Sequence, residues 1–120
     1  MSRMGQAKAA RLFGRIEMTE EELGENIRDA CEAFGWRCLW LRKTFHSSAG
    51  ILDMLLIPLR GFEHRRILHR ELKGYNARGE LGTLTIDQQQ TIWDINAAGG
   101  DAAMWGPRDW QSGKIINELR

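Results

Sequence analysis

Apolar residues recur every three to four positions between Glu20 and Phe34, the spacing of one face of an α-helix. Thr19 begins this segment with a capping box, because Glu22 follows it three positions later. Gly35 comes directly after the last apolar residue, as expected of a glycine that ends a helix. The pattern therefore predicts one amphipathic helix over residues 20–34.

Three short segments rich in large apolar residues follow this helix and predict β-strands. They are residues 36–41, 51–57 and 67–73. The second is apolar at nearly every position, as expected of a central strand covered on both faces. Because the second and third are joined by a short turn region, we expect them to be antiparallel neighbours.

The second half of the chain repeats the pattern of a capped helix followed by a strand. Thr85 and Gln88 form another capping box, which predicts a helix that runs to about Ala98. Residues 101–105 are predicted to form a short strand. A last helix over residues 109–119 is compatible with the pattern. The order α-β-β-β-α-β predicts an α/β domain, with a mixed sheet of about four strands flanked by helices. Residues 1–17 are basic and alanine-rich and predict a weakly ordered arm, which leaves residues 18–120 as a single domain.

Composition restricts the class of protein. The length of 120 residues suits one domain, and 42% hydrophobic and 28% charged residues are ordinary for a globular protein. The longest apolar run, residues 51–59, is too short to span a membrane, and no apolar segment follows the basic N-terminus. We therefore expect a cytoplasmic protein (in the host cytoplasm if viral) without a membrane partner. Because the net charge is only +1, any surface that binds nucleic acid must be a local cluster of basic residues.

Asp53 is unusual because it interrupts the most apolar of the predicted strands. A buried carboxylate is costly unless it is paired or bound to a cation. The alternative is a residue at a strand end that reaches water or accepts a backbone hydrogen bond. Asp53 alone does not decide between these interpretations.

Glu71 and Lys73 lie two apart on a predicted strand, so both side chains point to the same face. In a hairpin, Asp53 can lie across from them. Carboxylates of this kind bind Mg²⁺. The bound metal lowers the pKa of a water molecule and offsets the negative charge that builds on a phosphate. A lysine beside the metal positions the attacking water or stabilises the transition state. The set predicts phosphodiester hydrolysis that depends on Mg²⁺ or Mn²⁺, without an organic cofactor. The alternative for Glu71 and Lys73 is a surface ion pair.

Three motifs carry a family resemblance, namely Gly50-Ile-Leu-Asp53, Arg70-Glu-Leu-Lys73 and Leu84-Thr-Ile-Asp-Gln88. In this order and spacing they resemble the PD-(D/E)XK nucleases, and more narrowly the virus-type replication-repair nuclease (VRR-NUC) family, in its small stand-alone phage-type members. The resemblance covers about residues 18–110. Leu52 departs from the family, which usually has proline before the aspartate. Proline there supplies no ligand, so we expect activity to survive.

The resemblance implies a restriction-endonuclease-like core and a role for each matching residue. Asp53 and Glu71 would bind the metal, and Lys73 would be the catalytic lysine. The backbone carbonyl of Leu72 would be a further metal ligand. Gln88 would point at the site, and Glu20 would complete the metal environment. Helix capping alone also explains Gln88, and the helix dipole alone explains Glu20.

The expected function is that of a divalent-metal-dependent DNA endonuclease, which the family's small members suggest acts on four-way junctions or flaps. The rivals are a nucleic-acid-binding module that keeps the fold without cutting and, less favoured, a phosphohydrolase of small molecules. Tyr75 and Arg78, on a glycine-rich loop, either track a phosphate backbone or belong to a plain mobile loop.

A symmetric homodimer is expected, because resolving a junction takes two matched cuts. Its candidate surfaces are the first helix and four C-terminal residues, Trp110, Ile115, Ile116 and Leu119. The alternative is that these residues fold back on their own sheet. Among the tryptophans, Trp36, Trp93 and Trp105 are expected in the core.

Overall fold

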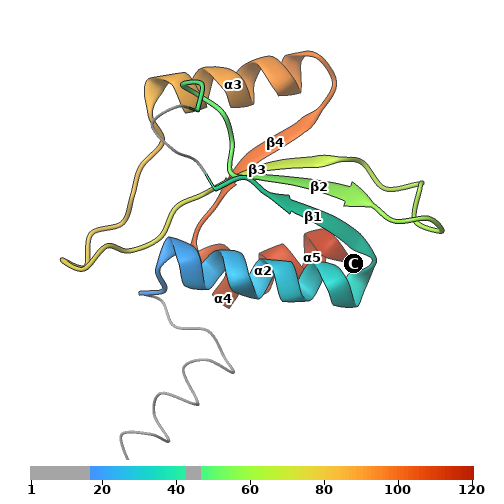
Figure 1. The fold of residues 1–120 in the computed structure, drawn as a ribbon, viewed down its shortest axis with the longest axis horizontal. Helices are drawn as coiled ribbons and strands as arrows, with labels where there is room; N and C mark the ends of the chain where they lie inside the picture. Colours follow the sequence, from blue (N-terminus) through green and yellow to red (C-terminus); the bar gives the residue numbers. More distant parts are fainter. Residues whose placement is uncertain (1–16, 43–46) are drawn as a thin grey trace, which may run out of the picture.

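The computed structural model describes residues 17–42 and 47–120, so the predicted N-terminal arm lies almost entirely outside the described residues. The helices and strands, in chain order, are α2 (Glu20–Phe34), β1 (Trp36–Trp40), β2 (Met54–Pro58), β3 (Leu68–Leu72), α3 (Ile86–Ala97), β4 (Asp101–Trp105), α4 (Pro107–Gln111) and α5 (Lys114–Leu119). In Figure 1 the sheet lies between α3 above and the group of α2, α4 and α5 below. The predicted α/β class, with helices flanking a four-stranded sheet, is confirmed.

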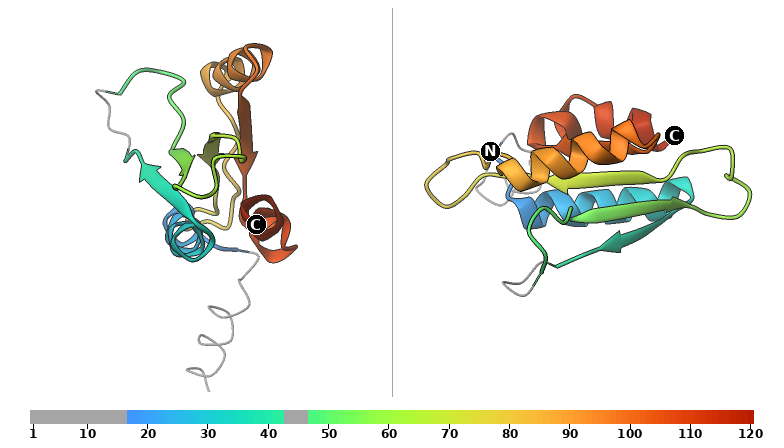
Figure 2. Two further views of the ribbon diagram at one scale, coloured as in Figure 1. Left: turned by 90° about the vertical axis from the view of Figure 1, so that its right-hand side faces the viewer. Right: turned by 90° about the horizontal axis from the view of Figure 1, so that it is seen from above.

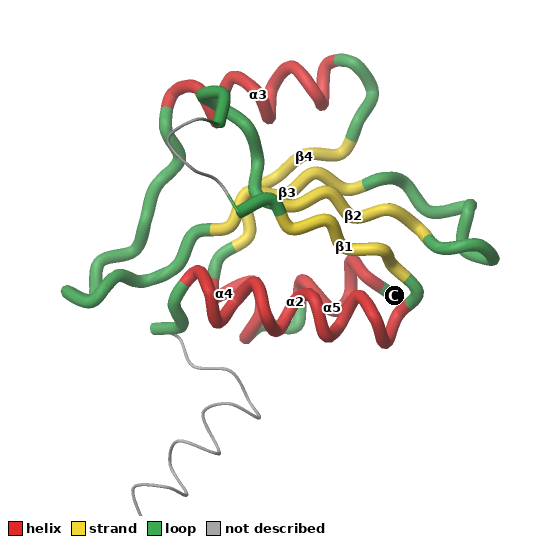
Figure 3. The backbone as a smooth tube through the Cα atoms, in the orientation of Figure 1, coloured by secondary structure: helices red, strands yellow, loops and turns green. Residues whose placement is uncertain are grey.

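The sheet is mixed, with the strand order β1-β2-β3-β4. The pairs β1–β2 and β2–β3 are antiparallel, as expected for the second pair from its short connection. The pair β3–β4 is parallel, and α3 forms the crossover between these two strands. Figure 2 shows the strands lying side by side, and Figure 3 shows the long loops at the ends of the sheet.

Helix α2 covers one face of this sheet. The Thr19 hydroxyl accepts a hydrogen bond from the Glu22 amide at 3.1 Å, and Gly35 ends the helix with a φ of 85°. The apolar stripe of α2 belongs to one buried core cluster that also contains apolar side chains from all four strands, namely Trp36, Met54, Leu56, Leu68, Leu72 and Trp105. The amphipathic pattern of residues 20–34 therefore predicted both the helix and its buried face.

The second strand begins later than predicted. Residues 51 and 52 precede β2, and the Ile51 amide donates to the Ser48 carbonyl at 3.3 Å within a turn. Pairing with β1 begins at Trp40 and Met54, so Asp53 stands directly before the strand and not inside it. Apolar composition alone could not distinguish these loop residues from the strand that they precede.

The C-terminal segment forms two short helices, where one was predicted. Gly113, with a φ of 85°, separates α4 from α5. Ile115 and Leu119 are fully buried in the chain's own core, while Trp110 and Ile116 pack against it. Ile115 and Leu119 therefore follow the fold-back alternative and cannot contribute to a dimer surface, while a role of the first helix in a dimer stays a prediction.

Trp93 is also placed differently from the prediction, because 74% of its surface is exposed. Helix α3 packs against β4 at the sheet edge, and Gln88 is its one buried residue. Trp93 faces away from that contact. Trp36 and Trp105 are buried, as expected.

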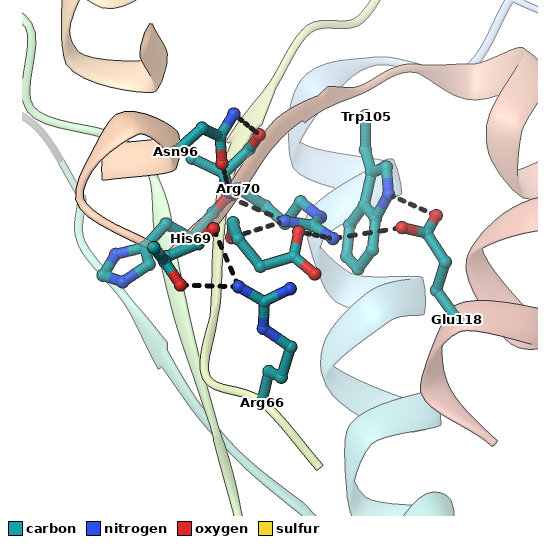
Figure 4. A network of polar contacts seen from close by, with 10 residues as sticks. Arg66, His69, Arg70, Asn96, Trp105 and Glu118 are labelled. Carbon is teal, nitrogen blue, oxygen red and sulfur yellow. Dashed lines mark hydrogen bonds and ion pairs between the residues drawn. The ribbon is translucent and has the colours of Figure 1, made fainter. Parts of the chain in front are cut away.

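A buried arginine fastens the C-terminal helix to the sheet (Figure 4). The Arg70 guanidinium donates to the Asp101 carbonyl at 2.9 Å and forms an ion pair with Glu118 at 3.0 Å. Glu118 also accepts from the Trp105 indole at 3.0 Å. These contacts tie β3 to β4 and α5, and so hold the strand that carries Glu71.

Candidate metal centre

Asp53 and Glu71 face each other where β2 begins and β3 ends. Met54 of β2 pairs with Arg70 of β3. Because the strands are antiparallel, Asp53, the residue before Met54, stands opposite Glu71, the residue after Arg70. The two residues are only 3% and 1% exposed. An Asp53 carboxylate oxygen accepts a hydrogen bond from the Leu72 amide at 2.7 Å. The predicted juxtaposition across two strands is present, although Asp53 lies at the strand's start.

Glu20 brings a third carboxylate to this point from the first turn of α2. One oxygen from each of Glu20, Asp53 and Glu71 lies within 4.8 Å of the other two. Carboxylate oxygens are the ligands that Mg²⁺ and Mn²⁺ prefer, so this donor set fits a small divalent cation. The dipole at the helix start accounts for an acid at this position, but not for its approach to the buried pair.

Close packing at Gly74 produces that approach. A Cβ atom on Gly74 would overlap the backbone of Thr19 and Glu20. The next residue, Tyr75, donates its amide to the Met18 carbonyl at 3.0 Å. The chain leaving β3 therefore lies directly against the start of α2, which brings Glu20 beside Glu71. Gly74 belongs to the glycine-rich loop that holds Tyr75 and Arg78, and the sequence pattern does not distinguish it from the other glycines of that loop.

The cluster raises the pKa of Glu20 from 4.5 to about 7. Burial of the carboxyl group is the largest cause, followed by the charge of Asp53, a hydrogen bond with Asp53 and the charge of Glu71, while Lys73 acts in the opposite direction. Neighbouring carboxylates repel, so each favours the protonated form of the next. A cation bound among them would relieve this repulsion.

The raised pKa of Glu20 predicts how stability depends on pH in the absence of metal. Because the folded pKa of about 7 lies above the ordinary 4.5, the contribution of Glu20 to stability is complete below pH 4.5. It is then lost as the pH rises through 7. Thermal unfolding in EDTA should show the wild type losing stability relative to Glu20→Gln across this window. Parallel pH profiles for the two proteins would contradict the clustering of Glu20.

Lys73 lies beside Glu71, one of the two buried carboxylates. Its ammonium is 3.1 Å from a Glu71 oxygen, and its side chain is 14% exposed. This excludes the alternative of a solvated surface pair, because the Glu71 side chain is 1% exposed. In a water-poor environment the charge of Lys73 acts more strongly than it would on the surface.

Gln88 combines the two interpretations that the sequence left open. Its side-chain oxygen accepts from the Thr85 amide at 3.0 Å, which completes the capping box of α3. Its side-chain nitrogen donates to a Glu71 oxygen at 3.0 Å. The cap thus fixes the amide group, and the amide group orients Glu71. Gln88 is both a helix cap and a part of the site.

The other predicted site residues are placed less directly. Leu72 contributes its amide, as the donor to Asp53, and metal binding by its carbonyl stays a prediction. Tyr75 lines a groove together with Glu20 and Glu21. Arg78 lies beyond that groove, in an exposed turn where its amide donates to the Asn76 side chain at 2.9 Å. The structure therefore brings Tyr75 to the site and leaves Arg78 away from it.

Two grooves meet at Glu20 and Glu21. One, of about 460 Å³, runs between the start of α2 and the end of β1 and reaches Asp53. The other, of about 550 Å³, runs between α2 and the loop after β3. The acidic cluster thus lies where an extended ligand could cross from one groove into the other. The sequence reading assigned no role to Trp40, Leu41 or Arg42, which line the first groove.

Across the described ranges, 17–42 and 47–120, no helix is both long and apolar enough to cross a membrane. No protein-family model matches the chain, and searches of curated proteins and of solved structures find no match.

Proposed function

We propose that this protein is a divalent-metal-dependent DNA endonuclease that hydrolyses phosphodiester bonds in replication, recombination or repair. The observation that carries the proposal is the convergence of Glu20, Asp53 and Glu71, with Lys73 3.1 Å from Glu71. Asp53 and Glu71 are buried and Glu20 approaches them from the exposed start of α2, and a cluster of carboxylates that shifts a neighbour's pKa is a feature of functional sites.

In this proposal Glu20, Asp53 and Glu71 hold Mg²⁺ or Mn²⁺, with the Leu72 carbonyl as a further ligand. The bound cation would acidify water and offset the charge that builds on the phosphate. Gln88 keeps one Glu71 oxygen fixed through its 3.0 Å hydrogen bond. The Leu72 amide does the same for Asp53 at 2.7 Å. Such contacts pre-orient ligands and reduce the reorganisation needed during the reaction.

Lys73 would act on the phosphate. Its ammonium bears a compact charge that can stabilise negative charge as it develops, or orient the attacking water. Its ion pair with Glu71 keeps it beside the acidic cluster in the absence of substrate. We assign Lys73 the role of the catalytic lysine.

The fold supports assignment to the PD-(D/E)XK nucleases, and within them to the VRR-NUC family. The site lies where antiparallel β2 and β3 meet, and a parallel β4 follows the crossover helix. Gln88 on that helix donates to Glu71, and a Glu20 oxygen from the first helix lies within 4.8 Å of oxygens of Asp53 and Glu71, as the sequence resemblance implies. The free thiols of Cys31 and Cys38 suit action in the cytoplasm.

The rival proposal is a nucleic-acid-binding module that retains the fold without cutting. Binding alone gives no reason to place a lysine against a buried glutamate or to cluster three acids, which repel DNA.

The test is incubation with labelled linear, flapped and four-way-junction DNA in Mg²⁺, Mn²⁺ or EDTA. We expect cleavage with either metal and none in EDTA. Binding without cleavage would favour the rival.

We further propose that the protein acts on branched DNA as a symmetric homodimer. Two matched cuts across a junction need two sites related by the symmetry of the substrate. Because the C-terminal helices are used inside the chain's own core, this proposal rests on that symmetry argument alone. Sedimentation at micromolar concentration should give twice the chain mass, and a labelled junction should show paired nicks. A monomer that degrades linear and branched DNA alike would contradict it.

A further inference from the structure

The groove between α2 and β1 carries a guanidinium beside the acidic cluster. It is lined by Glu20, Glu21, Trp40, Leu41, Arg42 and Asp53, and measures about 460 Å³. Three of these six residues are acidic, two are apolar, and Arg42 is the one cation among them. A phosphodiester strand that enters such a groove needs a cationic partner, because the acids repel its phosphates.

Trp40 gives Arg42 a fixed platform. The indole ring packs so closely on Gly24 of α2 that a Cβ atom on Gly24 would overlap it. The Arg42 guanidinium lies 4.2 Å from the centroid of this ring. Stacking on an aromatic ring leaves the edge N–H groups of a guanidinium free to bind an oxyanion in two-pronged geometry. The groove therefore presents an oriented anion-binding group.

In the absence of substrate, those N–H groups bind Glu21. One Arg42 nitrogen lies 2.8 and 3.0 Å from the two Glu21 carboxylate oxygens. The two side chains are 58% and 54% exposed, and such solvated pairs contribute little to stability. Arg42 can thus exchange this carboxylate for a phosphate at small cost.

We propose that the groove binds the substrate strand next to the cleaved phosphate, with Arg42 contacting a neighbouring backbone phosphate in place of Glu21. This inference rests on the proposed nuclease function and adds a substrate subsite to it. The strand then crosses Glu20 and Glu21 into the second groove, where Tyr75 lies. Arg42 is a binding residue and takes no part in the chemical step.

Arg28 provides a matched control. Its guanidinium also lies over Trp40, at 5.8 Å from the ring centroid, but it does not line the groove. Removing either arginine subtracts one positive charge near the same ring. Only the loss of Arg42 should remove a contact with phosphate.

The test measures binding of a labelled DNA oligonucleotide in Mg²⁺, by fluorescence anisotropy, over a series of salt concentrations. The Lys73→Ala protein serves as the parent, so that cleavage does not consume the probe. Adding Arg42→Ala should weaken binding about 5- to 8-fold at roughly 0.1 M salt and reduce the slope of log affinity against log salt by about 0.7 to 0.9. Adding Arg28→Ala should leave the slope unchanged.

A second set of probes locates the contact. Replacing single phosphates by neutral methylphosphonates should identify one position, close to the cleaved bond, where neutralisation weakens binding to the parent. That substitution should have no further effect on the Arg42→Ala protein. Equal slopes for the two arginine variants and the parent, or no DNA binding at all, would overturn the inference. DNA that binds through Arg42 but is never cut by the wild type would refute the nuclease and leave this subsite standing.

Discussion

Replacing Asp53 by asparagine should reduce the rate of metal-dependent DNA cleavage by a factor of roughly 10² to 10³ or more, the range found when one preorganised electrostatic contact is lost. Asparagine keeps the shape of the side chain and an oxygen that can accept from the Leu72 amide, now 2.7 Å from Asp53. It removes the negative charge that would hold the cation. Single-turnover cleavage of a labelled junction in Mg²⁺ is the measurement.

Asp29→Asn is the matched control for this experiment. Asp29 lies on the exposed face of α2, outside the acidic cluster, and the exchange makes the same change of charge and shape. It should cut like the wild type. Asp53→Asn should also melt no earlier than the wild type, because it removes a charge from a cluster whose acids repel. Wild-type cleavage by a folded Asp53→Asn protein would exclude Asp53 as a ligand.

Gly74→Ala should lower both stability and cleavage. The added methyl group would meet the backbone of Thr19 and Glu20, which cannot move without shifting the start of α2. Overpacking of this kind costs about 1–3 kcal/mol, and that corresponds to a melting temperature lower by several degrees. Displacing α2 also moves Glu20 away from Asp53 and Glu71, so metal-dependent cleavage should fall further than stability alone explains. Thermal unfolding and cleavage assays on the same preparation measure both effects.

Gly82→Ala separates a steric effect from a general effect of losing a loop glycine. Its nearest neighbour would be the Lys73 side chain, 3.3 Å from the new atom, which can give way. We expect a small change in stability for this variant, which therefore serves as the control for stability. If Gly74→Ala were as stable as Gly82→Ala, the close contact between α2 and the end of β3 would not hold Glu20 in place.

Local patterns predicted the parts of the fold that local forces decide. The capping boxes at Thr19 and Thr85 identified where α2 and α3 begin, and both are present with their reciprocal hydrogen bonds. The alternation along residues 67–73 placed Glu71 and Lys73 on one face, where they form an ion pair. The short connection between the second and third predicted strands indicated a hairpin, and the hairpin placed Asp53 across from Glu71.

Tertiary packing decided what the sequence left open or misplaced. Glu20 joins the site because Gly74 allows two backbones to touch, a contact that no periodicity encodes. Trp93 was expected in the core, but α3 contacts β4 at the sheet edge and leaves the ring exposed. The turn at Gly113 folds α5 back, so that residues suited to an interface fill the core. Each of these three placements depends on where a helix or loop lies relative to the sheet, and the hydrophobic pattern of that segment does not specify this position.

Glu20, Asp53 and Glu71 together should bind one divalent cation. Titration of the metal-free protein with Mn²⁺, followed by electron paramagnetic resonance of the unbound ion, tests it without reference to any substrate. We predict one site per chain in the wild type, lost in Asp53→Asn and weakened in Glu20→Gln. No binding by the wild type at tens of millimolar Mn²⁺, or equal binding by the wild type and Asp53→Asn, would contradict the claim.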